Sequence, residues 1–212
     1  MIQLDKKIEV VLKKYHKRMA IETALMQSLP IEEGMKRRDE FLLSVGLESA
    51  IFLNTLAKSA KSKTILEIGT SYGYSTIWLA EAAKTNGGRV ITLENNLEKA
   101  EFARQKIKEA GLSDVVEFRV GDALETLNLA TETFDFVLVD IWKELYVPCF
   151  DLFFPKLKHG AWVLGDNMIF PPHSRPEALA YQNRIRETKA FDTVLLPIGS
   201  GIEMSFLKNF NI

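Results

Sequence analysis

Two aspartates and an asparagine close two successive apolar stretches in the second half of the chain. Asp140 ends "FDFVLVD", and Asp166 and Asn167 end "GAWVLGDN". If these stretches are adjacent parallel strands, about 4.8 Å apart, the three side chains converge on one point. Two carboxylates and an amide oxygen form the hard, all-oxygen ligand set that Mg²⁺ prefers. The competing interpretation is structural, with Asp140 as a helix N-cap and Asp166–Asn167 as a turn.

Acidic residues also mark the ends of three earlier stretches. Glu67 lies in "TILEIG", Glu94 ends "RVITLE", and Asp122 follows "VVEFRVG". In open α/β sheets an acid at the end of the second strand accepts hydrogen bonds from ribose hydroxyls. Asp122 is placed to accept from the exocyclic amine of adenine. Glu67 would repel a pyrophosphate but suits a cationic amine or sulfonium group. These acids favour S-adenosylmethionine over NAD as the ligand.

The turn after the first stretch, "GTSYGYST", carries Gly69 and Gly73, which suit a sharp turn and close approach of a ligand to the backbone. A dinucleotide-binding turn would have the spacing G-x-G-x-x-G, whereas this chain has Ser71 at the middle position. Ligands of open α/β sheets bind beyond the carboxyl ends of the strands, which places Ser71 and Tyr72 in the crevice. The alternative is a tight strand-to-helix turn that holds no ligand.

A parallel sheet is needed to bring these residues together, and the sequence predicts one. From residue 63 onward, short β-rich stretches alternate with amphipathic segments. This alternation is typical of a parallel sheet covered by helices on both faces. The last two β-rich stretches, joined by "GSG", are predicted to form a closing hairpin. The predicted helices span 75–84, 97–110, 123–127 and 145–157, and the hairpin spans 191–199 and 201–209.

We predict one domain over residues 1–212, with a helical N-terminal extension at 1–60 and an α/β core at 61–212. Pro30 and Gly34 are expected to break the helical region, and Gly46 is a further candidate break. Residues 168–182, "MIFPPHSRPEALAYQ", are interpreted as a proline-rich substrate loop.

Composition excludes several classes of protein. With 212 residues, 47% of them hydrophobic, the chain can bury a core without disulfides or structural metals. A net charge of −1 gives no field that would attract nucleic acid or an anionic membrane. The single cysteine, Cys149, excludes an internal disulfide and is typical of a reducing cytoplasm. Charges interrupt the N-terminal segment, which argues against a signal peptide or anchor. We therefore expect a cytoplasmic protein without membrane or nucleic-acid partners.

The motifs, taken in order, resemble a known family. "ILEIGTSYGYST", "ITLEN", "GDA", "FDFVLVDIWKELY" and "GDNMIFP" are similar to the small metal-dependent O-methyltransferases of the catechol and caffeoyl-CoA type. The resemblance runs from about Val45 to the C-terminus. The glycine turn is shared by most S-adenosylmethionine enzymes, whereas the D-x-W-K and D-N segments are more specific. The resemblance implies a Rossmann-like class I methyltransferase fold with a seven-stranded, mostly parallel sheet and a C-terminal antiparallel hairpin.

The family resemblance also implies catalytic roles. Asp140, Asp166 and Asn167 correspond to ligands of a divalent metal, with Mg²⁺ expected and Mn²⁺ or Ca²⁺ as alternatives, and Asp140 counts among the catalytic residues. Lys143 corresponds to the general base, and a lysine beside a divalent cation has a lowered pKa. Its alternative is a solvated lysine. Glu203 corresponds to an acid that holds a second substrate hydroxyl, and its alternative is an edge-strand carboxylate facing solvent.

The family resemblance also implies which residues contact the substrate and the cofactor. Trp142 and Pro171 correspond to residues against a flat aromatic substrate, near Lys143, Asn167 and Glu203. A tryptophan at this place would equally fit the core or pack on adenine. Many bacterial members carry a second acid where this chain has Trp142. The residues implied to contact S-adenosylmethionine are Val45, Gly46, Glu67, Gly69, Ser71, Tyr72, Gly73, Ser75, Glu94, Asn95, Asp122, Ala123, Asp140 and Trp142.

Three functions are therefore weighed. The favoured one is in-line transfer of a methyl group to one hydroxyl of a small catechol-like substrate, with a metal that lowers the hydroxyl pKa. An NAD-dependent oxidoreductase is disfavoured by the glycine spacing and by Glu67. The third is a catalytically inactive nucleoside-binding protein of the same fold. The resemblance is also compatible with a homodimer formed through the N-terminal helices.

Overall fold

A seven-stranded sheet forms the centre of the computed structural model, which describes residues 3–37 and 40–208. The strand order is β3-β2-β1-β4-β5-β7-β6. The strands β1 to β5 pair in parallel, and β7 is antiparallel to both β5 and β6. This arrangement confirms the predicted fold class, including the closing hairpin. The strands are β1 Thr64–Ile68, β2 Arg89–Glu94, β3 Val116–Val120, β4 Phe134–Val139, β5 Leu157–Gly165, β6 Phe191–Leu196 and β7 Ile202–Leu207.

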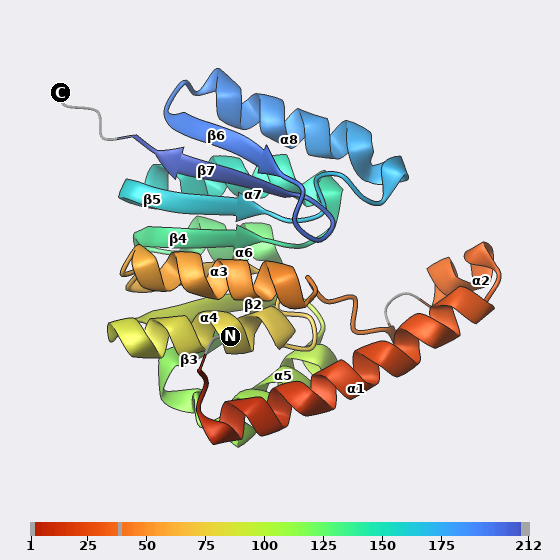
Figure 1. Cartoon of the computed structure of the whole chain (residues 1–212). Helices are drawn as coiled ribbons and strands as arrows, with labels where there is room; N and C mark the ends of the chain where they lie inside the picture. The colour runs from red at the N-terminus through yellow and green to blue at the C-terminus, as the bar shows by residue number, and fades with distance from the viewer. Residues whose placement is uncertain (1–2, 38–39, 209–212) are drawn as a thin grey trace.

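Helices cover both faces of the sheet (Figure 1), with α3 and α4 in front of it and α6 and α7 behind. The side chains of α1, α3, α4 and α5 share one core cluster with one face of the sheet, and those of α6, α7 and α8 share another with the opposite face. Among the described residues, no helix is long and apolar enough to cross a membrane. The helices are α1 Lys6–Ser28, α2 Ile31–Lys36, α3 Leu47–Ser59, α4 Tyr74–Asn86, α5 Leu97–Glu109, α6 Ala123–Leu129, α7 Tyr146–Phe153 and α8 Arg175–Glu187.

Strand register places the candidate site residues at one edge of the sheet. Ile68 at the end of β1 pairs with Val139 of β4, and Val139 pairs with Gly165 of β5. Because the strands are parallel, the residues that follow them leave the sheet at the same edge. Asp140 and Asp166 therefore emerge side by side, next to the turn that follows β1.

The helical N-terminal region departs from expectation at Gly34, whereas the candidate break at Gly46 coincides with the start of α3. Pro30 separates α1 from α2 as predicted, but Gly34 lies inside α2, so the prediction of a break there is wrong. Gly46 precedes α3 with φ +82°, and α3 begins at Leu47. Because α1 and α3 share a core cluster with α4, they pack as part of the body of the protein, and the division at residue 60 stays a prediction.

Two further expectations are wrong in the second half of the chain. The helix predicted over 145–157 ends at Phe153. Residues 175–182, interpreted as part of a loop, lie in α8, which spans Arg175–Glu187. Pro176 stands in the first turn of α8, where its missing N–H would have had no partner within the helix, so the proline starts this helix instead of breaking it.

A candidate active site at the carboxyl ends of the strands

The turn between β1 and α4 is built around two glycines. Gly69 has φ +105°, and a Cβ there would lie 2.0 Å from the carbonyl oxygen of Asp140. Gly73 has φ +85°, and its Cβ would lie 2.8 Å from the Cβ of Ala103. Only glycine fits either place. The backbone of the turn therefore packs directly against the end of β4, which joins the expected cofactor turn to the expected metal site.

Glu67 is fully buried below this turn. Its Oε2 accepts hydrogen bonds from Thr76 Oγ1 at 2.5 Å and Thr92 Oγ1 at 2.6 Å. Its Oε1 is buried without a hydrogen-bond partner among the described residues. Burial raises the pKa of the Glu67 carboxyl to about 7. A positively charged ligand group near this oxygen would favour the ionised form.

Glu94 and Asp122 lie at the ends of β2 and β3, as predicted. Glu94 Oε2 accepts a 2.7 Å hydrogen bond from the backbone N–H of Ser71, so it lies directly against the glycine turn. Asp122 uses Oδ1 to cap α6, accepting from the N–H groups of Leu124 and Glu125 at 2.8 and 3.0 Å. The cap is a structural use of Asp122 that the sequence analysis did not consider. Asn95 is exposed and Ala123 is half-buried beside these two acids.

The remaining expected cofactor residues lie on two segments. Ser71 and Tyr72 belong to the glycine turn, and Ser75 is buried in the first turn of α4. Val45 is buried and, with Gly46, leads into α3. The structure thus gives each residue a place, and contact with a cofactor stays a prediction for all of them.

Asp166 and Asn167 follow β5, next to Asp140. Asp166 is 2% exposed, and its Oδ1 is buried without a partner among the described residues. Burial and the nearby charge of Asp140 raise the pKa of Asp166, and burial raises that of Asp140. Asn167 has φ +52°, a conformation that asparagine tolerates better than most residues. Asp140 does not cap a helix, because the 3-10 helix Lys143–Leu145 has Trp142 at its N-cap.

The described part of the chain contains no group of three or more His, Cys, Asp and Glu side chains placed to hold a metal. The expected set has only two acids and an amide. It nevertheless fits a hard cation, because the partnerless Asp166 oxygen is buried beside a second carboxylate.

Lys143 extends its amine toward these acids. Its Nζ donates a 2.5 Å hydrogen bond to Tyr146 Oη. The Tyr146 hydroxyl lies 2.9 Å from the carbonyl of Val139 and 3.2 Å from that of Asp166, so the ends of β4 and β5 fix its position. Burial lowers the pKa of Lys143 to about 8, against the opposing effect of the Asp140 and Asp166 charges. Lys143 is half-buried and its amine is bonded to Tyr146, so it is not a fully solvated lysine, and its role as the base stays a prediction.

Glu203 has a different environment from the one expected. It lies on β7 opposite Gly165 and is fully buried, so the alternative of a solvent-facing carboxylate is wrong. Its Oε1 accepts hydrogen bonds from Arg186 at 2.8 Å and Thr193 at 2.6 Å, and its Oε2 accepts from Gln182 at 2.5 Å. Both oxygens are engaged with α8 and β6, and a substrate role for Glu203 stays a prediction.

The segments expected to line the substrate site are largely exposed to solvent. Trp142 is 40% exposed just after β4, and Phe170, next to Pro171, is 61% exposed. Tyr146 is the site residue that the sequence analysis did not single out. The signal was its position three residues after Lys143, which is a contact spacing in a helical turn.

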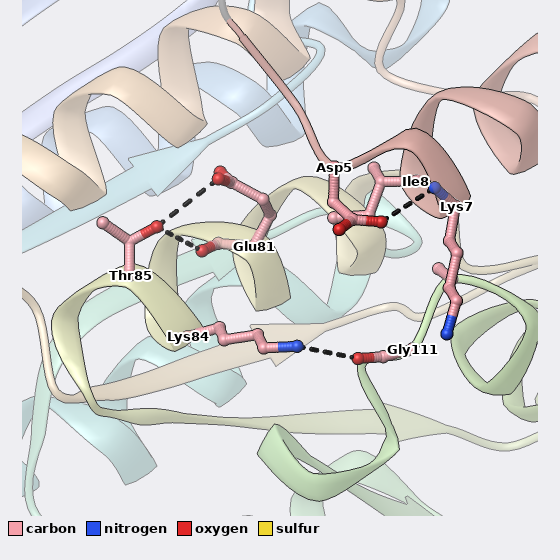
Figure 2. Close-up of a pocket in the computed structure, with 8 residues that line it drawn as sticks. Asp5, Lys7, Ile8, Glu81, Lys84, Thr85 and Gly111 are labelled. Atoms are coloured by element: carbon pink, nitrogen blue, oxygen red, sulfur yellow. Dashed lines mark hydrogen bonds between the residues drawn. The ribbon is translucent and has the colours of Figure 1, made fainter.

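A separate hollow of about 330 Å³ lies near the far end of α4 (Figure 2). Its polar groups already have partners within the protein. Lys84 Nζ donates to the carbonyl of Gly111 at 3.0 Å, and Thr85 Oγ1 to the carbonyl of Glu81 at 3.0 Å. Asp5 caps α1. Because α4 begins at the glycine turn, this hollow is at the opposite end of the helix from the candidate site.

The chain belongs to the O-methyltransferase family, because residues 16–206 match the family model described as O-methyltransferase. This confirms the family predicted from the motifs. The chain is 41% identical over 128 residues to a catechol O-methyltransferase of Mycobacterium tuberculosis, covering 60% of this chain and 58% of that protein. It is 27% identical over 184 residues to caffeoyl-CoA O-methyltransferase 5 of Nicotiana tabacum, covering 77% and 76%.

A solved structure extends the comparison over nearly the whole chain. The O-methyltransferase from Bacillus cereus in complex with SAH (S-adenosylhomocysteine) matches with a TM-score of 0.76 and 30% identity, covering 98% of this chain and 93% of that one. The chain spans 58 to 60% of the length of the catechol O-methyltransferases that it matches.

Proposed function

We propose that this protein transfers a methyl group from S-adenosylmethionine to a hydroxyl of a small, catechol-like aromatic substrate, with a divalent cation and Lys143 activating that hydroxyl. The observation that carries the proposal is the Lys143 amine, which interacts electrostatically with the half-buried Asp140 and the buried Asp166 at adjacent strand ends. The backbone of this site touches the glycine turn, since a Cβ on Gly69 would meet the Asp140 carbonyl. Family membership favours this activity over an NAD-dependent oxidoreductase.

The cofactor cleft supports a sulfonium ligand. The partnerless Glu67 oxygen is buried beneath the turn, where a nearby positive group would favour the ionised carboxylate, and the two glycines let the backbone of the turn pack closely against Asp140 and Ala103. Glu94, already bonded to the turn at Ser71, lies where a ribose would bind. S-adenosylmethionine bound there would supply an electrophilic methyl group.

Asp140, Asp166 and Asn167 are the residues that would hold the cation. A divalent cation among them would lower the pKa of a substrate hydroxyl, and Mg²⁺ fits the all-oxygen donor set. Burial raises the pKa values of the two aspartates more than the Lys143 charge lowers them, and a bound divalent cation would offset this cost.

Lys143 would take the hydroxyl proton. With a pKa lowered to about 8, a substantial fraction of the amine is neutral near neutral pH. Tyr146 holds that amine in place, because its hydroxyl is itself anchored to the Val139 and Asp166 carbonyls. The methyl group would pass from the sulfonium to the substrate oxygen to leave SAH, and Lys143 would keep the proton until solvent removes it.

The test is a methyl-transfer assay with labelled S-adenosylmethionine, a panel of catechols and single phenols, and Mg²⁺ present or chelated. We expect transfer to vicinal diols that requires the cation. Lys143→Met should lower turnover by about 100-fold or more and leave SAH binding intact. The matched control is Lys158→Met, because Lys158 pairs with Asp135 at the opposite edge of the sheet.

The results separate the remaining functions. Unchanged turnover in Lys143→Met would remove this residue as the base. Full transfer in chelator would remove the cation. SAH binding without transfer to any acceptor in the panel would favour the nucleoside-binding protein.

A further inference from the structure

Helix α1 touches both segments that are expected to hold the cofactor. One is the glycine turn at 69–73, and the other is the segment 41–46 that leads into α3. Three side chains of α1 make these contacts, at spacings of three and four residues that place them on one face of the helix. We call Tyr15, Arg18 and Glu22 the α1 brace.

The first end of the brace is Tyr15. It is 2% exposed, and its hydroxyl donates a 2.5 Å hydrogen bond to the backbone carbonyl of Tyr72, inside the glycine turn. Its ring packs edge-on against Tyr74 and Phe102, with centroids 5.7 and 6.4 Å away. The hydroxyl also lies 3.7 Å from where a Cβ on Gly73 would be. The conformation of the turn therefore depends on a residue 57 positions earlier in the chain.

The second end of the brace is Glu22. Its Oε2 accepts a 2.7 Å hydrogen bond from the backbone N–H of Leu42, and Leu42 is 3% exposed. Close by, Ser44 Oγ lies 3.5 Å from the sulfur of Met19 on α1. These contacts hold the segment that carries Val45 and Gly46.

Arg18 joins the two ends. Its Nε donates a 2.6 Å hydrogen bond to Glu22 Oε1, and its guanidinium lies 4.1 Å from the centroid of the Tyr72 ring. A cation over an aromatic face is an attractive contact, and it is stronger when partly shielded from water. The Arg18 side chain is 27% exposed and that of Glu22 is 16% exposed. The contacts thus run without a gap from Tyr72 through Arg18 and Glu22 to Leu42.

We propose that α1 sets the separation of the two cofactor-binding segments, with Tyr15 and Glu22 as positioning residues for S-adenosylmethionine. The proposal rests on the proposed function for the identity of the ligand. Each end of the brace satisfies one backbone group, Tyr72 C=O or Leu42 N–H, and the Arg18–Glu22 pair joins them. Loss of either contact breaks the connection that fixes the separation of the two walls, and binding must then include the free-energy cost of restoring that separation.

The experiment compares Tyr15→Phe, Glu22→Gln and the double variant. Tyr15→Phe keeps the ring and removes only the hydroxyl. Glu22→Gln keeps the shape but leaves one acceptor oxygen for two donors, Arg18 Nε and the Leu42 N–H, so the link between them is broken. We expect the Kd for SAH, measured by calorimetry, to rise about tenfold in each single variant. Because either change opens the same brace, the double variant should bind about as weakly as the weaker single variant. If the two changes were independent structural defects, their fold-increases in Kd would instead multiply in the double variant.

Two further measurements separate positioning from general instability. In the methyl-transfer assay, KM for S-adenosylmethionine should rise while kcat at saturating cofactor stays within about twofold. The control is Lys14→Gln, which removes the exposed 3.0 Å pair between Lys14 of α1 and Glu109 of α5 without touching either segment. We expect its Kd for SAH to match that of the wild type.

Hydrogen exchange in the ligand-free protein tests the brace without any cofactor. Tyr15→Phe should speed exchange of the Leu42 amide, and Glu22→Gln should speed exchange in the glycine turn, each by about tenfold. Exchange that changes only at the mutated end would overturn the inference, as would single variants with the SAH affinity of the wild type. If the wild type fails to bind SAH, the proposed function fails, and the exchange result still decides whether α1 couples the two segments.

Discussion

Carboxylates at the two edges of the sheet differ in how many of their oxygens have hydrogen-bond partners. At the edge where the parallel strands begin, Asp135 accepts hydrogen bonds from the backbone N–H groups of Lys63 and Thr64, both at 3.0 Å, and from Lys158 Nζ at 3.1 Å. At the edge where they end, Glu67 and Asp166 each bury an oxygen that has no partner among the described residues.

This difference supports the proposal that ligands bind at the second edge. An unpaired buried carboxylate oxygen is costly, and its cost disappears when a cation or a donor arrives. At the first edge, both oxygens of the Asp135 carboxylate have partners within the protein, and these contacts contribute stability. The second edge is incomplete without a ligand, and the two partnerless oxygens lie where a sulfonium cofactor and a divalent cation are proposed to bind.

The largest effect should come from Asp166→Asn. This change removes a proposed cation ligand, and we expect cation-dependent methyl transfer to fall by at least about 100-fold. The free energy of unfolding of the metal-free protein should stay the same or rise, because the variant no longer buries that charge. Kinetic assays and urea unfolding measure the two quantities.

Two outcomes for Asp166→Asn would contradict the proposed difference between the two edges. A variant that keeps its activity would mean that Asp166 is a structural residue like Asp135. A variant that unfolds far more easily without metal would mean that the Asp166 carboxylate is already well paired in the metal-free fold.

A second effect concerns pH and Glu67. Its folded-state pKa of about 7 lies above the ordinary value of 4.5, so the folded protein holds this proton more tightly than the unfolded chain. The contribution is fully present below pH 4.5 and is lost as pH rises toward 7. Between these limits, the free energy of unfolding of the ligand-free wild type should fall by about 3 kcal/mol relative to Glu67→Gln.

Urea titrations of both proteins across this window give the comparison. Equal pH dependence in the two would show that Glu67 is already ionised in the ligand-free fold. Glu132, with a pKa lowered to about 2 mainly by its hydrogen bond to Arg119, acts in a different window, because its stabilisation is lost only as pH falls below 4.5.

The smallest effect should come from Asp135→Asn at the opposite edge. The amide oxygen can still accept from the two backbone N–H groups, and only the partly exposed charge pair with Lys158 is lost. We expect the free energy of unfolding to fall by about 1 kcal/mol or less, with methyl transfer unchanged. A large loss of activity would show that the two edges are not independent.

Local patterns were enough to predict the parallel strands, the glycine turn and the hairpin. Each depends on residues close in sequence, such as the apolar runs that end at Asp140 and Asp166. Helix α8 was missed because its prolines favoured a loop, although Pro176 occupies the helix position that tolerates proline best.

Long-range contacts were beyond the sequence patterns. Tyr15 follows the same helical periodicity as its core neighbours, and nothing local marks its hydroxyl as the partner of Tyr72. The buried network around Glu203 likewise depends on how α8 packs on β6 and β7. The resemblance supplied candidate roles, whereas partners and burial required the fold.

The central claim is that the incomplete edge binds S-adenosylmethionine, and a calorimetric titration of the wild type with SAH, with and without excess NAD, tests it most directly. The account predicts a Kd on the order of micromolar that NAD does not change. No heat on adding SAH, or full displacement of SAH by NAD, would contradict it.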